Sequence, residues 1–359
     1  MRFCDVTLRE ATQIPGREYT VEQTIAAGRA LDELSLSLVQ TGFPATGEHD
    51  TTVTQRLADV LENDVVAIAR ARDDDVDAAL EADADVVEVF VPVSDRQLNA
   101  ILGLSRDEAF ESAQDAIDRV RDGGARPHLT LMDAFRTDAD DVAPAFERFN
   151  VSITLTDTVG ARTPSFVAGY LRSLAGLGVS LDRIGVHFHD DLGVATANAL
   201  VAARLGVDRV DVSVASLGER AGNPALEEVA VALEADGHDT GLARDQLIPA
   251  CRAVLDALDE PVDPRAPVIG EAVTSHESGL HTAAMLEDPA TFEPYDPETF
   301  GGERRLLFGA HTGREAATRL LERADKEPTE ELIDALLDRL AETEEPIELD
   351  EAVAIAEQL

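Results

Sequence analysis

The stretch that decides the fold, IGVHFHDDLGVATANAL at residues 184–200, runs from a short apolar segment through two histidines and two aspartates into a helix-like segment. His187 and His189 are two residues apart, so in a strand their side chains point to the same face. Two imidazoles on one face at the end of a strand form a ready pair of metal ligands. The alternative is that both histidines are packed in the core or simply exposed.

Seven further apolar, strand-like runs accompany the run at 184–188, and segments with helical periodicity lie between them. These runs lie at 3–8, 37–41, 65–69, 86–91, 128–132, 151–155 and 210–215. Repeated strand-then-helix units over about 250 residues are what a (β/α)8 barrel requires. A doubly wound open sheet is the alternative, but no Gly-x-Gly-x-x-Gly motif follows the first run. The sequence therefore predicts an α/β fold of the TIM-barrel type.

The composition of the chain changes after residue 261. The segment VDPRAPVIGEAV at 262–273 is rich in proline and is typical of a linker. Helical patterns follow at 315–323, 329–340 and 350–358. We therefore expect a barrel domain over residues 1–260. Residues 261–359 are then a linker and a small, mainly helical C-terminal appendage that acts as a lid near the barrel mouth.

The formal charge of the chain is −41, and its single lysine is Lys326. Such a surface repels nucleic acids and anionic membranes, so neither is an expected partner. The acidic residues are spread among apolar positions, which predicts a folded protein with an acidic surface, as in proteins from salt-loving organisms. Cys4 and Cys251 are too few for a disulfide framework and favour the reducing cytoplasm. The sequence shows no run of membrane-spanning length and no signal-peptide pattern at its start.

A barrel places its chemistry just beyond the carboxyl ends of its strands. Glu10, His187 and His189 occupy such positions, and together they offer three ligands while leaving others open for a substrate. That set suits a catalytic divalent cation, Mg²⁺, Mn²⁺ or Zn²⁺, acting as a Lewis acid. Alternatively, Glu10 is a surface carboxylate paired with Arg9. Asn223 either adds a carbonyl oxygen to the set or holds a water there, or it caps the helix that follows it.

Other polar side chains at the expected mouth are candidates for substrate contacts. Arg9 and Arg136 offer the planar guanidinium that grips a carboxylate, or are surface ion pairs. Thr158 donates a hydrogen bond to the same carboxylate or caps the next turn. His281, outside the barrel, is a general acid or base delivered by the lid, or a surface histidine on a helix.

Taken together, the motifs resemble those of the metal-dependent Claisen-condensing TIM-barrel family. That family includes 2-isopropylmalate, citramalate and homocitrate synthases and is related to 3-hydroxy-3-methylglutaryl-CoA lyase. The resemblance covers almost the whole chain. In order, the motifs that carry it are TLREATQIPG, TGFPATGEHD, DAFRTD, DTVG, HFHDDLGVATANAL, SLGERAGNPALEE, HESGLHTAAML and FGGERRLLFGAHTGREA.

The resemblance implies an enzyme of amino-acid biosynthesis, an acyltransferase that adds the methyl carbon of acetyl-CoA, or of another acyl-CoA, to the keto carbon of a 2-oxo acid and then releases CoA. It also implies a homodimer. The matching positions make Glu10, His187 and His189 the metal ligands, with Asn223 nearby. By the same matching, Arg9 polarises the keto group, Gln13, Arg136 and Thr158 contact the oxo acid, and His281 acts near the acetyl group.

Four positions depart from the family pattern. Gln40 and Met132 stand where glutamates are usual, Gln97 where histidine is common, and Phe292 where tyrosine is common. Loss of an acid–base carboxylate slows proton transfer by orders of magnitude. Two alternatives therefore stay open: a lyase or aldolase on the same scaffold, and a catalytically weak paralogue that binds a 2-oxo acid or an active subunit.

The family branch also stays open. Glu10 after the arginine and the motif DAFR favour homocitrate synthases, whereas GFP after Thr41 favours isopropylmalate and citramalate synthases. We further expect no leucine control through the C-terminal regulatory domain that some family members carry, because the chain has no room for it.

Overall fold

The structure is a computed structural model that describes all residues, 1–359. The chain forms two compact units. Unit 1 comprises Met1–Ala243 and Ala250–Val262, and unit 2 comprises Arg244–Pro249 and Asp263–Leu359. The main division follows Val262, two residues beyond the limit expected from the sequence.

Unit 1 is a closed barrel of eight parallel strands, as predicted. The strands are β1 (Arg2–Asp5), β2 (Leu38–Gly42), β3 (Asp64–Arg70), β4 (Val86–Pro92), β5 (Arg126–Met132), β6 (Ser152–Asp157), β7 (Ile184–Phe188) and β8 (Arg209–Val212). Each strand pairs with the next in sequence, and β8 pairs with β1 to close the barrel. Because all neighbouring strands are parallel, their carboxyl ends lie at the same end of the barrel and form one mouth.

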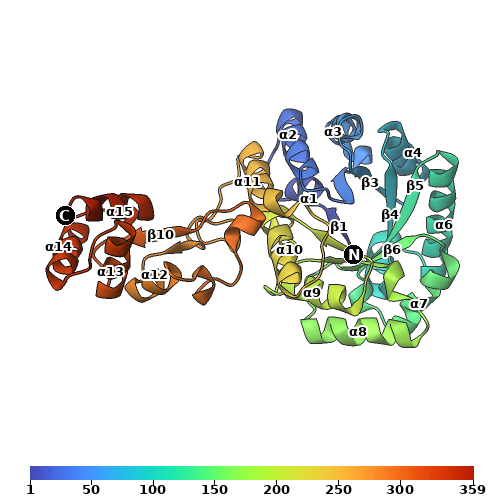
Figure 1. Ribbon diagram of the computed structural model, residues 1–359. Coiled ribbons are helices and arrows are strands. Elements are labelled where there is room, and N and C mark those ends of the chain that lie inside the picture. The colour runs from blue at the N-terminus through green and yellow to red at the C-terminus, as the bar shows by residue number, and fades with distance from the viewer. The chain divides into compact units, whose positions relative to one another are not determined.

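Helices surround the strands of unit 1 in Figure 1. The helices of this part of the chain are α1 (Thr7–Ala11), α2 (Val21–Asp32), α3 (Glu48–Ala58), α4 (Asp73–Glu81), α5 (Asp95–Gln97), α6 (Arg106–Asp122), α7 (Ala139–Arg148), α8 (Pro164–Gly176), α9 (Ala195–Leu205), α10 (Leu226–Ala235) and α11 (Leu247–Ala257). Helix α6 illustrates how they are specified. Ser105 and Glu108 form a capping box at its start, and residues spaced by three or four, from Ala109 to Val120, bury one face.

The first strand is shorter than the sequence predicts, and this correction matters for the site. The expected strand at 3–8 ends at Asp5, because the Asp5 carboxylate accepts hydrogen bonds from the backbone N–H and the hydroxyl of Thr7, both at 2.9 Å. This local turn competes with further strand pairing. The chain then enters α1, which carries Arg9 and Glu10.

A second correction concerns the segment after β8. The predicted strand at 210–215 ends at Val212, and Ala215 and Ser216 adopt left-handed backbone conformations. Asn223 was a candidate cap of the next helix, but α10 starts at Leu226, with Ala225 in the N-cap position. Asn223 is therefore not a helix cap, which removes the structural alternative for this residue.

The interior of the barrel holds an unusually large polar side chain. Arg209 on β8 is fully buried. Gly185 on the neighbouring strand makes room for it, because a Cβ atom at Gly185 would lie 3.1 Å from Nε of Arg209 and 2.8 Å from the hydroxyl of Thr154. A larger residue at position 185 would therefore collide with the polar interior.

Unit 2 was expected to be mainly helical, and the structure adds a small sheet. Its helices are α12 (Gly279–Met285), α13 (Arg314–Arg323), α14 (Glu330–Ala341) and α15 (Leu349–Glu357). Three strands in the order β11-β10-β9 accompany them: β9 (Ser275–His276), β10 (Arg305–Phe308) and β11 (Ile347–Glu348). Two of these strands have only two residues, which is too short for a periodic sequence pattern to reveal.

Both cysteines, Cys4 and Cys251, are buried and free. None of the helices combines the length and the apolar composition needed to cross a membrane.

Candidate metal centre and substrate cavity

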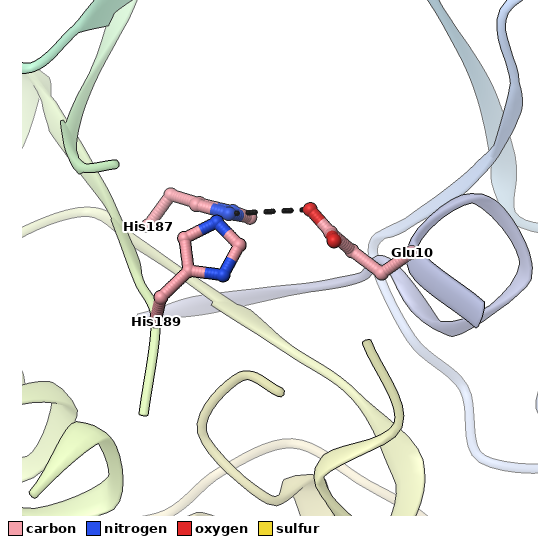
Figure 2. Close-up of side chains that lie close together, drawn as sticks. All are labelled: Glu10, His187 and His189. Carbon is pink, nitrogen blue, oxygen red and sulfur yellow. Dashed lines mark ion pairs between the residues drawn. The ribbon is translucent and has the colours of Figure 1, made fainter. Parts of the chain in front are cut away.

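Three buried side chains converge at the barrel mouth (Figure 2). Glu10 comes from α1, His187 from β7, and His189 from just beyond the end of β7. One ligand atom from each lies within 4.8 Å of the others, and Oε1 of Glu10 is 3.4 Å from Nε2 of His187. One carboxylate and two imidazoles held this closely form a metal-binding cluster of the kind that leaves positions open to a substrate. Glu10 pairs with Arg9, but it is only 1% exposed and is not a surface carboxylate.

Neighbouring groups fix the orientation of the ligands. Nδ1 of His187 lies 3.1 Å from Oδ2 of Asp211, so the histidine donates a proton there and presents Nε2 to the cluster. The amide nitrogen of Asn223 donates to the carbonyl of Phe188 at 3.0 Å. Buried Oδ1 of Asn223 and Nδ1 of His189 have no hydrogen-bond partner within the protein. An amide oxygen and an imidazole nitrogen that are buried without partners beside a ligand set are groups that a bound cation or its water would satisfy, so the residues fit a metal ion.

The electrostatics of the cluster also favour a cation. Burial raises the pKa of Glu10, but Arg9 and His187 outweigh it and hold the pKa well below its usual range. Burial lowers the pKa of His187, but hydrogen bonds to Asp211 and Glu10 raise it to about 9. Burial and the charge of His187 lower the pKa of His189 to about 3. The carboxylates that hold a proton on His187 produce the negative potential in which a cation binds.

A cavity of about 200 Å³ opens beside the cluster, which is smaller than the pockets that hold drug-sized ligands. Its lining combines the three candidate ligands with polar and apolar side chains from other strands. These are Arg9, Gln13, Gln40, Ile68, Glu88, Phe90, Thr130, Met132, Thr156, Thr158, Asp211 and Glu219. A buried polar cluster that opens on a cavity of this size suits a small polar substrate.

Comparison with known proteins identifies the family of this site. A family described as HMGL-like matches residues 1–254, well over half of the chain. This chain belongs to the HMGL-like family. A second family, described as homocitrate synthase post-HMGL domain-like, matches residues 268–346.

Several characterised or assigned proteins resemble this HMGL-like chain over most of its length. Homocitrate synthase AksA of Methanopyrus kandleri is 37% identical, with 94% of this chain and 86% of the relative covered. A probable 2-isopropylmalate synthase of the same organism is 35% identical, with 95% and 69% covered. The 2-isopropylmalate synthase of Sulfurisphaera tokodaii is 32% identical, with 99% and 95% covered.

Solved structures resemble the fold of this HMGL-like protein. The crystal structure of hydroxymethylglutaryl-CoA lyase from Pseudomonas aeruginosa superposes with a TM-score of 0.64 over 76% of this chain and 96% of that chain. The two sequences are 21% identical, so this likeness concerns the fold alone.

The structure brings Arg9, Gln13 and Thr158 to the cavity, as expected. Nε of Arg9 donates to Oε1 of Gln40 at 2.6 Å, and Nη1 of Arg9 pairs with Glu10. Gln40, where the family usually has glutamate, thus still accepts a hydrogen bond from the arginine. The hydroxyl of Thr158 accepts from the backbone N–H of Asp133 at 2.9 Å and faces the cavity.

Arg136 does not line this cavity. It lines a separate one of about 390 Å³, together with Ser94, Arg106 and Arg162. Its guanidinium holds both carboxylate oxygens of Asp133, at 2.6 and 2.7 Å. A contact between Arg136 and the oxo acid would require this bidentate pair to open, so the contact stays a prediction.

His281 lies on α12 in unit 2. Its ring stacks on Phe292, with ring centroids 3.9 Å apart, and lies 6.3 Å from the ring of His276. Phe292 thus supplies the flat face that a tyrosine at this position would also supply, but without a hydroxyl. The predicted role of His281 near an acetyl group stays a prediction.

Three buried charged residues of this HMGL-like protein, next to the candidate site, were not singled out from the sequence. Asp211, Arg209 and Glu88 are buried side chains on β8 and β4 that together form a charged network inside the barrel. A signal was present, because RVDV at 209–212 alternates charged residues with valine and VVEVFV at 86–91 contains one acid. Charged residues at period two in a buried strand point into the barrel interior.

Proposed function

We propose that this protein condenses the acetyl group of acetyl-CoA with a 2-oxo acid, as a synthase of the homocitrate, 2-isopropylmalate and citramalate type in amino-acid biosynthesis. Relatives named for these three products are 35–37% identical to it. The single observation that carries the proposal is the convergence of buried Glu10, His187 and His189 on a small cavity that also receives a guanidinium.

The cluster is the place for the keto end of the oxo acid. A divalent cation held by these three residues, Mg²⁺, Mn²⁺ or Zn²⁺, would supply Lewis-acid polarisation of the keto oxygen. Arg9 contributes from the protein side. Two of its nitrogens are fixed by Gln40 and Glu10, so the guanidinium is held in place, and Nη2 makes no hydrogen bond within the protein. A preorganised donor of this kind stabilises negative charge that develops on an oxygen.

Other residues position the substrate. Gln13 and Thr158 line the cavity and offer an amide and a hydroxyl to the carboxylate of the oxo acid. Oδ1 of Asn223, buried and without a partner, offers an acceptor beside the cluster. Met132 lines the cavity with a thioether where a carboxylate is usual, so this side chain moves no proton. We assign proton transfer at the acetyl group to His281, as the family resemblance implies.

The test is release of free thiol from acetyl-CoA by purified, metal-loaded protein in molar KCl, with a panel of 2-oxo acids. We expect thiol release in equal amount with a new hydroxy acid identified by mass spectrometry. Chelation should abolish the reaction and added divalent cation should restore it. Absence of thiol release with every oxo acid, while the metal is bound, would contradict the proposal. Production of an oxo acid from a hydroxy acid or its thioester would instead indicate a lyase.

We extend the proposal to the oligomeric state and the cellular location of the protein. A homodimer is expected from the family resemblance, and light scattering after gel filtration at high salt tests it through the mass in solution. A cytoplasmic location remains the expectation from the two free cysteines.

A further inference from the structure

One wall of the cavity is apolar. Ile68 on β3, Phe90 on β4 and Met132 on β5 line it, and each is partly exposed although it lies within or at the end of a barrel strand. The order of strands around the barrel places β3, β4 and β5 across from β7, β8 and β1. The apolar wall therefore faces the cluster of Glu10 and the two histidines. A 2-oxo acid whose keto end lies at the cluster directs its side chain toward this wall.

The deeper part of the same wall is acidic. Glu88 on β4 lines the cavity and is only 3% exposed. Thr130 donates a hydrogen bond to one of its carboxylate oxygens, and Nη2 of Arg209 lies 3.0 Å from the other. Arg209 also lies 3.2 Å from Asp211, so two carboxylates share this one buried guanidinium. Arg209 therefore has no further capacity to pair with a carboxylate of a substrate.

No cation is free to receive a second carboxylate at this wall. Arg9 is the only lysine or arginine among the residues that line the cavity, and it belongs to the cluster, where Gln40 and Glu10 hold it. Arg209 is fully buried and already paired, and Arg136 lines the other cavity with Asp133. A carboxylate at the far end of a substrate would thus lose water and meet Glu88, and both effects disfavour its binding.

We infer that the oxo acid taken by this site has an uncharged aliphatic side chain. The inference rests on the proposed function and names its substrate class: short or branched 2-oxo monocarboxylic acids such as pyruvate, 2-oxobutanoate and 2-oxoisovalerate. It excludes oxo acids with a second carboxylate, such as 2-oxoglutarate and oxaloacetate. Apolar contact with Ile68, Phe90 and Met132 favours the first group, and the charge of Glu88 rejects the second.

The experiment compares the two groups by thiol release and, independently of turnover, by calorimetric titration of each oxo acid into metal-loaded protein. We expect kcat/KM for the best aliphatic acid to exceed that for either dicarboxylic acid by about 100-fold, with the same order of binding. A dicarboxylic acid as the best substrate would overturn the inference and leave the condensation standing. No thiol release with any acid would contradict the condensation, and the titrations would still rank the two groups and decide the inference.

Two substitutions test whether Glu88 and the apolar wall cause the rejection of dicarboxylic acids. Glu88→Gln removes the charge and keeps an acceptor for Thr130, so the ratio of kcat/KM for dicarboxylic over aliphatic acids should rise about tenfold. Glu228→Gln is the matched control, because Glu228 lies on α10 outside the cavity and should leave the ratio unchanged. Met132→Lys places a cation on the apolar wall and should raise the affinity for dicarboxylic acids even if Glu88→Gln does not fold. An unchanged ratio in both cavity variants would overturn the inference.

Discussion

Nδ1 of His187 donates a hydrogen bond to Oδ2 of Asp211, and the two atoms are 3.1 Å apart. Both residues are buried in the interior of the barrel. The contact joins the metal-binding cluster to the buried charges beneath it, because the other oxygen of Asp211 lies 3.2 Å from Nε of Arg209. The histidine ring is therefore held in one orientation before any ligand arrives. Such outer partners of metal ligands contribute strongly to affinity.

Asp211→Asn should weaken divalent-cation binding by about 10- to 100-fold while the protein stays folded. The amide replaces an acceptor that holds the histidine proton, so His187 loses both orientation and basicity. Calorimetric titration with Mn²⁺ measures the change. Asp208→Asn is the matched control, since Asp208 pairs with Arg2 just before β8 and should not alter the affinity. Equal affinity in Asp211→Asn and the wild type would refute this role.

Removal of the metal should lower the stability of the barrel. A ligand that binds only the folded state, at a concentration a thousandfold above its Kd, raises the free energy of unfolding by about 4 kcal/mol. Calorimetric unfolding with and without chelator should therefore show a higher Tm for the Mn²⁺-loaded protein. Glu10→Gln should abolish most of this difference, because a neutral amide is a poor replacement for the buried carboxylate. If Mn²⁺ raises the Tm of Glu10→Gln as much as that of the wild type, the ion binds elsewhere.

Glu227 should make the stability depend on pH. Burial raises the pKa of its carboxyl to about 7 in the folded protein, from an ordinary unfolded value near 4.5. Between these values the folded state binds more protons than the unfolded state, so stability falls as pH rises through the window. Glu227→Gln keeps an acceptor for the N–H of Ala215 and removes this dependence. From about pH 5 to about pH 8, the wild type should lose roughly 2 to 3 kcal/mol relative to the variant.

Chemical denaturation of the two proteins across this pH range provides the measurement. Glu228→Gln, a change at the next and partly exposed residue, is the control and should run parallel to the wild type. A constant difference between the wild type and Glu227→Gln at all pH values would show that the buried carboxyl does not titrate in this range.

Molar salt should stabilise the protein. The chain has 71 acidic residues against 30 lysines and arginines, and repulsion among the unpaired carboxylates opposes folding at low ionic strength. Salt at about 1 M shortens the screening length to about 3 Å. The Tm measured in KCl should therefore rise steadily from 0.1 M to 2 M, and a flat or falling Tm would contradict the proposed salt-loving character.

The sequence was sufficient to predict the barrel and to predict that Glu10, His187 and His189 lie close together. The reason is physical: strands alternate their side chains, and parallel strands in sequence share one mouth. The end of β1 could not be predicted from its apolar run, because the hydrogen bonds of Asp5 to Thr7 end the strand locally. The pairing of Arg209 with Glu88 could not be predicted either, since it spans the barrel between residues 121 positions apart.

The role of Arg136 shows a different limit. The motif DAFRTD at 133–138 predicted Arg136 at the mouth. Whether its guanidinium binds a substrate or the carboxylate of Asp133, three residues earlier, depends on side-chain geometry that the sequence does not show. The apolar wall of the cavity could not be predicted from the sequence for a related reason. Ile68 and Phe90 stand in ordinary apolar strand runs, and Met132 was noted only as the replacement of a usual glutamate. Only the closed barrel brings all three to one cavity.

The most direct test of the central claim is the anomalous diffraction from a crystal of the protein soaked with Mn²⁺ and 2-oxoisovalerate. The account predicts one strong peak bonded to Glu10, His187 and His189, with the keto acid bound at the same ion and its side chain against Ile68 and Phe90. Absence of a peak at these three residues, with manganese bound elsewhere in the barrel, would contradict it.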